Sequence, residues 1–250
     1  MIDEHSCCGD IVRVVRARAV VFDFYGTLSV SATRIQRQEA AAGVAAELGI
    51  PAETLRDAIA VTFTERATGA CGNLEETMRW LAERCGYAPT SEQLRRACDL
   101  RRTTEDVYAR ALRPDAVPTL RALREQGIKV GVLSDCTHEL PEIWPSLPLA
   151  DFVDATVFSV EAGLRKPHPD LYASMTRLLD VPAPECLYVG DGGSGELTGA
   201  TQAGMTAFHL RTSDAAEATL YDAEPSWSGA FVTTLSDVLA LLDSRPAPAP

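Results

Sequence analysis

A short apolar segment that runs directly into an aspartate constrains the fold of this chain most. Residues 20–28 read Val-Val-Phe-Asp-Phe-Tyr-Gly-Thr-Leu, so β-branched and aromatic residues end at Asp23. Such a run at the start of an alternating strand–helix pattern predicts a buried central strand. Open α/β sheets carry their chemistry at the carboxyl ends of their strands, so Asp23 is a candidate nucleophile. The alternative is a turn residue that caps the next segment.

Two later apolar segments also end in polar residues. Residues 130–135 end in Ser134 and Asp135, and residues 186–191 end in Asp191. Both segments read as strands, because they are short, apolar and bounded by polar residues. Each of the three strands therefore carries a polar group at its carboxyl end, where an open α/β sheet places its ligands.

Two charged residues complete the pattern. Lys166 stands in Lys-Pro-His-Pro, where the prolines favour an extended backbone. Glu196 follows Asp191 by five residues, at the expected start of a helix. A surface lysine and a first-turn helix acid are the alternative interpretations of these two residues.

In this order and spacing the four segments resemble those of the haloacid dehalogenase superfamily of hydrolases, most of which are phosphatases. The resemblance extends from about residue 18 to about residue 242. It implies an α/β fold with a doubly wound, Rossmann-like parallel-sheet core and a smaller α-helical cap domain. A helical cap physically excludes water and supplies contacts to the substrate.

The chain between the first and second expected strands reads as helical throughout. Apolar residues recur there at helical spacing, and glycine and proline separate the segments. Asn73 and Ser91 are candidate N-caps. The expected helices are 32–48, 52–68, 74–85 and 91–112. The expected domains are a flexible leader at 1–17, a core at 18–29 and 114–243, a helical cap at 30–113 and a disordered tail at 244–250.

The resemblance also implies roles for the residues at the strand ends. Asp23 would be the nucleophile that forms an aspartyl-phosphate. Lys166 would offset its negative charge and that of the substrate. Thr27 and Ser134, with Asp135 beside it, would bind the substrate phosphate.

A magnesium ion is expected at the same place. Three carboxylates in one pocket repel each other unless a cation joins them, and oxygen ligands with a phosphate substrate favour Mg²⁺. The resemblance assigns this metal to Asp23, the backbone carbonyl of Tyr25, Asp191 and Glu196. The longer arm of Glu196, where aspartate is usual, suggests contact through water.

Tyr25 departs from the phosphatase pattern and leaves the reaction open. Phosphatases carry a second aspartate there as general acid and base, whereas Asp-x-Tyr-Gly-Thr resembles the 2-haloacid dehalogenases. Asp135 and Asp191 favour the phosphatase, because dehalogenases are metal-free and carry other residues there. We therefore expect a magnesium-dependent phosphatase of a small phosphorylated metabolite, with Asp23, Tyr25 and Lys166 as its catalytic residues. Loss of the second aspartate predicts slow turnover, a preference for good leaving groups, or a cap carboxylate such as Glu39, Glu47 or Glu65 in the acid–base role. The alternatives are a dehalogenase and a catalytically weak binding or regulatory protein.

Composition limits the other functions. The net charge of −12 disfavours nucleic acid as a partner, because a phosphate backbone attracts basic surfaces. No run approaches the roughly 20 apolar residues of a membrane span. Seven cysteines at irregular positions argue against a disulfide framework and favour a cytoplasmic enzyme. The expected partner is a small-molecule substrate, and a homodimer remains open.

Overall fold

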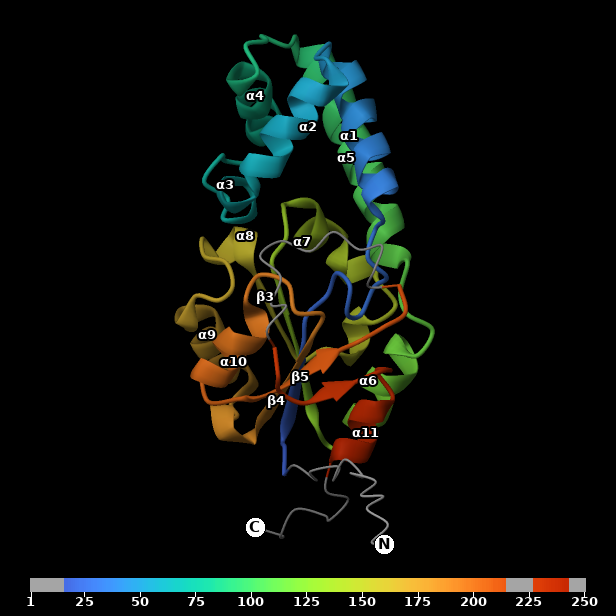
Figure 1. Ribbon diagram of the computed structural model, residues 1–250, viewed down its shortest axis with the longest axis vertical. Coiled ribbons are helices and arrows are strands. Elements are labelled where there is room, and N and C mark those ends of the chain that lie inside the picture. The colour runs from blue at the N-terminus through green and yellow to red at the C-terminus, as the bar shows by residue number, and fades with distance from the viewer. Residues whose placement is uncertain (1–15, 215–226, 243–250) are drawn as a thin grey trace, which may run out of the picture.

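A computed structural model describes residues 16–214 and 227–242 of the chain. The expected tail at 244–250 and nearly all of the expected leader at 1–17 lie outside the described residues. The chain forms two lobes, a sheet flanked by helices and a group of helices above it (Figure 1). The upper lobe is inserted directly after the first strand, so the chain leaves the core and returns to it.

The core is one six-stranded sheet in which every neighbouring pair is parallel. The spatial order is β3-β2-β1-β4-β5-β6, so β1 is central. The strand order reverses between β1 and β4, which is where open parallel sheets bind their ligands. The strands are β1 (Ala19–Phe22), β2 (Lys129–Ser134), β3 (Ala155–Phe158), β4 (Cys186–Gly190), β5 (Thr206–Leu210) and β6 (Phe231–Val232).

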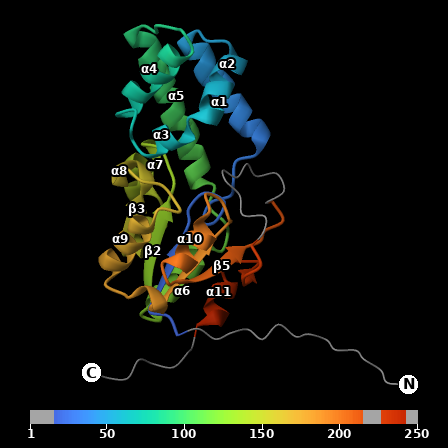
Figure 2. The same ribbon diagram turned by 60° about the vertical axis from the view of Figure 1, so that its left-hand side comes forward.

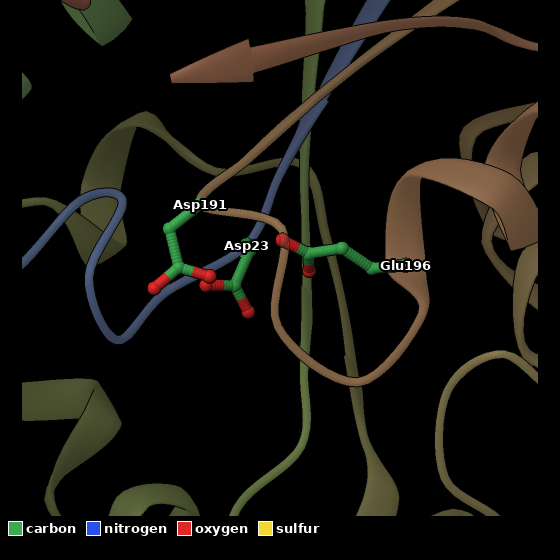
Figure 3. A group of neighbouring side chains, drawn as sticks. All are labelled: Asp23, Asp191 and Glu196. Carbon is green, nitrogen blue, oxygen red and sulfur yellow. The ribbon is translucent and has the colours of Figure 1, made fainter. Parts of the chain in front are cut away.

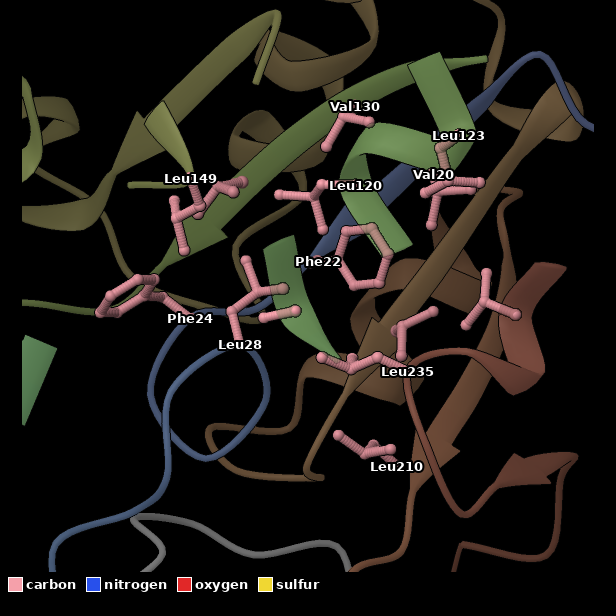
Figure 4. Close-up of a cluster of buried hydrophobic side chains, with 14 of the residues drawn as sticks. Val20, Phe22, Phe24, Leu28, Leu120, Leu123, Val130, Leu149, Leu210 and Leu235 are labelled. Atoms are coloured by element: carbon pink, nitrogen blue, oxygen red, sulfur yellow. The ribbon is translucent and has the colours of Figure 1, made fainter. Parts of the chain in front are cut away.

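Helices cover both faces of this sheet, which confirms the doubly wound α/β prediction. Successive residues of β1 point to opposite faces. Val20 and Phe22 pack with helices α6 and α11, whereas Ala19 and Val21 pack with α9 and α10 (Figure 4 shows the first cluster). These helices are α6 (Ala116–Glu125), α9 (Pro169–Leu179), α10 (Glu196–Gln202) and α11 (Asp237–Leu241).

Short helices lie at the ends of the remaining strands. Two α-helical segments border the upper edge of the sheet, below the cap (Figures 1 and 2). They are α7 (Glu139–Ile143) and α8 (Ser159–Ala162). The 3-10 turns are η1 (Trp144–Ser146), η2 (Ala150–Phe152) and η3 (Ala183–Glu185).

Five helices form the cap. They are α1 (Arg34–Leu48), α2 (Ala52–Val61), α3 (Phe63–Ala67), α4 (Leu74–Arg84) and α5 (Ser91–Arg110). Four of them, α1, α2, α4 and α5, pack around an apolar cluster of their own. The helix expected at 52–68 is broken at Thr62, whose φ of −119° is not helical. The N-cap of α5 is Thr90 rather than Ser91, because the Thr90 hydroxyl accepts the Gln93 amide in a capping box. No described helix is both long and apolar enough to cross a membrane.

Two antiparallel segments join the cap to the core. The Val30 amide donates to the Ala111 carbonyl (2.8 Å), and the Arg113 amide donates to the Leu28 carbonyl (2.9 Å). Arg113 also donates through its side chain to the carbonyls of Gly26 (2.8 Å) and Thr27 (3.0 Å). The cap connection is therefore fixed to the loop that directly follows Asp23.

We expect Leu120→Ala to destabilise the core. Leu120 is fully buried in the cluster of Figure 4, and a cavity left by Leu→Ala costs about 2–5 kcal/mol. The control is Leu178→Ala, since Leu178 is 60% exposed and surface changes stay within about 0.5 kcal/mol. Urea unfolding measures both, and equal effects would contradict this packing.

Candidate active site

The carboxyl ends of β1 and β4 bring three carboxylates together. Asp23 directly follows β1, Asp191 follows β4, and Glu196 begins α10. One oxygen of each lies within 4.8 Å of the others. Figure 3 shows the three side chains pointing toward one another from these separate segments. The site therefore lies at the carboxyl ends of the strands, where the sequence predicts it, and at the reversal of strand order that the structure shows.

Lys166 is the cation that faces this group. Its Nζ lies 2.6 Å from Asp23 Oδ1 and 2.5 Å from Glu196 Oε2, and the side chain is only 3% exposed. Burial by itself lowers the pKa of Lys166, but the adjacent Asp23 and Glu196 carboxylates raise it well above its ordinary value. Lys166 is therefore held protonated between the nucleophile candidate and Glu196.

Glu196 has a different environment from the one the sequence suggests. Its Oε2 accepts hydrogen bonds from Lys166 Nζ and from the Tyr188 hydroxyl (2.7 Å), and its Oε1 accepts the Gly192 amide (2.9 Å). The residue is completely buried. Because both oxygens already accept hydrogen bonds, Glu196 holds Lys166 and the Gly192 loop in place. Its expected water-mediated metal contact stays a prediction.

Three carboxylates carry more negative charge than the single Lys166 ammonium can offset. Burial and this excess of charge raise the pKa values of two of these carboxyl groups. Burial raises the pKa of Asp23 to about 7; Lys166 opposes the rise and Glu196 adds to it. Burial also raises the pKa of Asp191 well above its ordinary value, and the Glu196 and Asp23 charges raise it further. Without another cation, the site therefore favours protonated carboxyl groups near neutral pH.

The residues fit a hard divalent cation. Among the described residues, Asp191 Oδ1 accepts the Gly193 amide (3.0 Å), and Asp191 Oδ2 packs so closely against Gly26 that a Cβ atom there would lie 2.0 Å from it. Gly26 has a φ of +86°, in the region that favours glycine. A carboxylate set with an excess of negative charge is the donor type that Mg²⁺ prefers. Asp23 and Asp191 are the residues best placed to hold it.

Two buried hydroxyl groups, one in the loop after β1 and one at the end of β2, have no hydrogen-bond partner among the described residues. Thr27 Oγ1 and Ser134 Oγ are both buried and unpaired in the described part of the chain. An unpaired buried hydroxyl is costly, so such groups call for an explanation. Both hydroxyls expected to bind phosphate are thus unpaired, as is the buried hydroxyl of Thr119 in α6.

The side chain of Asp135 contacts the loop that contains Lys166. Its Oδ1 accepts the Lys166 amide (2.9 Å) and its Oδ2 accepts Arg165 Nε (3.2 Å). Both carboxylate oxygens thus already accept hydrogen bonds from the protein. Asp135 therefore anchors the backbone of Lys166, and a direct contact with substrate stays a prediction.

Tyr25 turns its side chain toward the cap. Its hydroxyl donates to Glu105 Oε2 (3.2 Å), and Glu105 Oε1 lies 2.9 Å from Arg101, which also bonds Glu139 (2.8 Å). Burial raises the pKa of the Tyr25 phenol, and the Glu105 charge adds to the rise, so the phenol stays neutral.

Sequence reasoning missed Glu105. Helical spacing places Arg101 and Glu105 on one face of α5, but it does not show which face meets the core. The cap carboxylates named from the sequence do not line the cavity described below. Glu47 instead pairs with Arg96 at the cap surface (2.7 Å).

A cavity of about 160 Å³ lies between the core and the cap. Asp23, Lys166 and Asp191 line its core side. The cap contributes both polar and apolar groups, among them Arg37, Glu105, Val44 and Phe63. The cavity can hold a small molecule with one end at Asp23.

Comparison with known proteins identifies the family. The sequence model of a family described as haloacid dehalogenase-like hydrolases matches residues 17–204. A glyceraldehyde 3-phosphate phosphatase of Methanopyrus kandleri is 33% identical over 132 residues, which cover 52% of this chain and 56% of that protein. A ribulose-1,5-bisphosphate 5-phosphatase of Halopiger xanaduensis is 32% identical over 111 residues, which cover 44% and 46%. The chain thus matches only about half the length of these curated relatives.

A solved structure shares the fold over most of the chain. The 2-haloacid dehalogenase from Pseudomonas syringae pv. Tomato DC3000 superposes with a TM-score of 0.63 and 24% identity. The superposition covers 90% of this chain and 97% of that one. Both the core and the cap are therefore shared in architecture.

We expect magnesium to stabilise the protein more at pH 8 than at pH 5.5. The folded-state pKa of Asp23, about 7, is raised above the ordinary 3.8, so the free protein loses stability as pH rises between these values. Mg²⁺ must displace that proton at low pH but not at pH 8. At a hundred times its Kd, Mg²⁺ adds about 2.7 kcal/mol, which thermal unfolding detects.

Asp191→Asn is the control for this measurement, because it removes one carboxylate and keeps the shape. The magnesium-dependent rise in Tm should disappear in this variant. A rise that is equal at both pH values, or that persists in Asp191→Asn, would contradict the proposed position of the cation.

Proposed function

Because the chain belongs to the haloacid dehalogenase-like hydrolases, we propose that it is a magnesium-dependent phosphatase of small phosphorylated metabolites, acting through an aspartyl-phosphate on Asp23. The observation that carries the proposal is the group of Asp23, Asp191 and Glu196 around a single buried lysine. A phosphatase site needs this excess of oxygen ligands, because a divalent cation and a phosphate must both be bound there. The phosphatase names of the two curated relatives agree with it.

The residues of the chain have distinct tasks in this reaction. Lys166 binds Asp23 Oδ1, so the other Asp23 oxygen is the one that attacks phosphorus. The bond from phosphorus to the leaving oxygen breaks as the bond to Asp23 forms, and the leaving oxygen takes a proton from water. A second water then attacks the aspartyl-phosphate, which releases phosphate and restores Asp23. Thr27 and Ser134 donate their unused hydroxyl hydrogens to the phosphoryl oxygens. Lys166 offsets the charge that develops there.

Magnesium, when bound, neutralises phosphoryl charge and lowers the pKa of Asp23 so that its carboxylate is free to attack. Asp23 and Asp191 would hold it through carboxylate oxygens, and the Tyr25 backbone carbonyl is the third protein ligand that we propose. A carbonyl is independent of the side chain, so tyrosine serves here as well as aspartate would.

Dehalogenation is the second candidate, and Tyr25 is the observation that favours it. In that reaction Asp23 would displace halide from carbon, and no cation would be required. Asp191 weighs against it, because this carboxylate places a further negative charge beside Asp23 and a substrate carboxylate. The two reactions share a nucleophile but differ in their products and in their need for magnesium.

The first test measures phosphate release from a panel of phosphorylated metabolites with and without magnesium, beside chloride release from 2-chloropropionate. We expect magnesium-dependent phosphate release that falls at least roughly a thousandfold in Asp23→Asn, because the nucleophile is lost. Chloride release that is indifferent to a chelator would instead establish the dehalogenase. Release of neither product, with ligand binding retained, would indicate a binding protein.

We expect Tyr25→Asp to accelerate turnover of alkyl phosphates. The substitution restores a carboxyl group that can protonate the leaving oxygen, and general acid–base catalysis contributes about 10²–10⁴-fold. The control is Tyr25→Phe, which removes only the hydrogen bond to Glu105 and keeps the backbone carbonyl. Steady-state kcat measures both. A lower kcat in Tyr25→Asp with the fold intact would show that Tyr25 itself is required.

A further inference from the structure

The cap touches the core at a second place, far along the chain from the two antiparallel segments that join cap and core. Helix α3 and the turn after it lie on α8, at the opposite side of the cap from α1 (Figures 1 and 2). Gly69, with a φ of +67°, approaches so closely that a Cβ atom there would lie 2.7 Å from the Val160 carbonyl oxygen. The Gly72 carbonyl oxygen lies 2.6 Å from His138 Nε2. We call residues 63–72 the cap foot.

Arg165 joins the cap foot to the core. Its Nη1 donates to Thr64 Oγ1 (3.1 Å), and its guanidinium carbon lies 5.0 Å from the centre of the Phe63 ring. An arginine stacked on an aromatic ring and hydrogen-bonded at its edge is held in one orientation. Contact of the cap foot with the core therefore fixes the orientation of the Arg165 side chain.

The same guanidinium contacts two loops of the active site. Its Nε donates to Asp135 Oδ2 (3.2 Å), and its Nη2 donates to Ser194 Oγ (3.1 Å). Ser194 lies in the loop between Asp191 and Glu196 and has a φ of +57°, which is uncommon for a residue other than glycine. Arg165 thus braces the loop that follows β2 and the loop that follows β4.

The contact with Asp135 leads directly to Lys166. The other Asp135 oxygen accepts the Lys166 amide (2.9 Å), so Arg165 and the Lys166 backbone share one carboxylate. The Lys166 side chain then reaches Asp23 (2.6 Å). A continuous set of hydrogen bonds therefore runs from Thr64 in the cap through Arg165, Asp135 and Lys166 to the nucleophile.

We propose that Arg165 is a positioning residue that couples the seating of the cap foot to the placement of Lys166 against Asp23. With the foot seated, the guanidinium holds Asp135, and Asp135 holds the Lys166 amide. With the foot lifted, the guanidinium loses its cap contacts and its hold on Asp135 loosens. The reactive arrangement is then assembled only when the cap has closed over a substrate. The activity measurements rest on the phosphatase function proposed above, whereas the coupling itself does not.

The test lifts the cap foot without touching Arg165. Gly69→Ala places a Cβ atom against the Val160 carbonyl, and Gly86→Ala is its matched control. Gly86 is also in the cap and also has a positive φ, of +83°, but a Cβ atom there meets nothing within 4 Å. Both substitutions strain the backbone alike, and only Gly69→Ala separates cap from core. Arg165→Met removes the coupling residue itself.

Two quantities are measured for each variant. The first is kcat and KM for phosphate release. The second is hydrogen exchange at the Lys166 amide, which needs no activity. We expect Gly69→Ala and Arg165→Met to lower kcat about tenfold or more and to accelerate this exchange, because a charge-assisted hydrogen bond is lost. Gly86→Ala should leave both unchanged, and Gly69→Ala combined with Arg165→Met should lose no more than Arg165→Met alone.

Several results would overturn the coupling. These are equal behaviour of Gly69→Ala and Gly86→Ala, unchanged Lys166 exchange in Gly69→Ala, or a loss in Arg165→Met confined to KM. If Arg165→Met does not fold, Arg165→Lys takes its place, since lysine keeps the charge but cannot bridge three acceptors. Absence of phosphate release by the unaltered protein, with exchange changed as expected, would refute the phosphatase function and leave the coupling standing.

Discussion

The structure depends on one buried ammonium group among three carboxylates. Lys166 lies within 2.6 Å of Asp23 and 2.5 Å of Glu196, and Asp191 completes the acidic set. Ions of like charge are held so close in a dry site only when other groups offset them. Lys166 offsets one charge, so the site retains an excess that a divalent cation can neutralise. Burial and the neighbouring carboxylate charges raise the pKa values of Asp23 and Asp191 for the same reason.

Each acidic residue of the site has its own set of contacts, and this separates their tasks. Glu196 is fully buried and accepts hydrogen bonds from Lys166, Tyr188 and the Gly192 amide, so it fixes the lysine. Asp191 lines the cavity between core and cap, and the structure gives it one hydrogen bond, from the Gly193 amide, so it can take a ligand. Residues that look equivalent in a motif are thus distinguished by what surrounds them.

The cap meets the active site along two routes with different chemistry. In the loop after Asp23, Tyr25 donates to Glu105 of the cap, which pairs with Arg101. At the cap foot, Arg165 joins Thr64 to Asp135. Both routes end beside a catalytic position, at Tyr25 in the loop after Asp23 and at Arg165 next to Lys166. Closure of the cap over a substrate would exclude water from this cavity and strengthen electrostatic interactions within it.

The sequence by itself determined the strands, their polar ends and the inserted cap, because these depend on local apolar periodicity and on turn residues. Asp23, Lys166 and Asp191 were identifiable since each directly follows or lies between such strands. Tertiary structure alone decided that Asp135 and Glu196 accept hydrogen bonds within the protein, and that Glu105 rather than Glu39, Glu47 or Glu65 meets Tyr25. Helical periodicity shows which residues share one face of a helix but not which face meets the core. That orientation is set by long-range packing of the cap on the core.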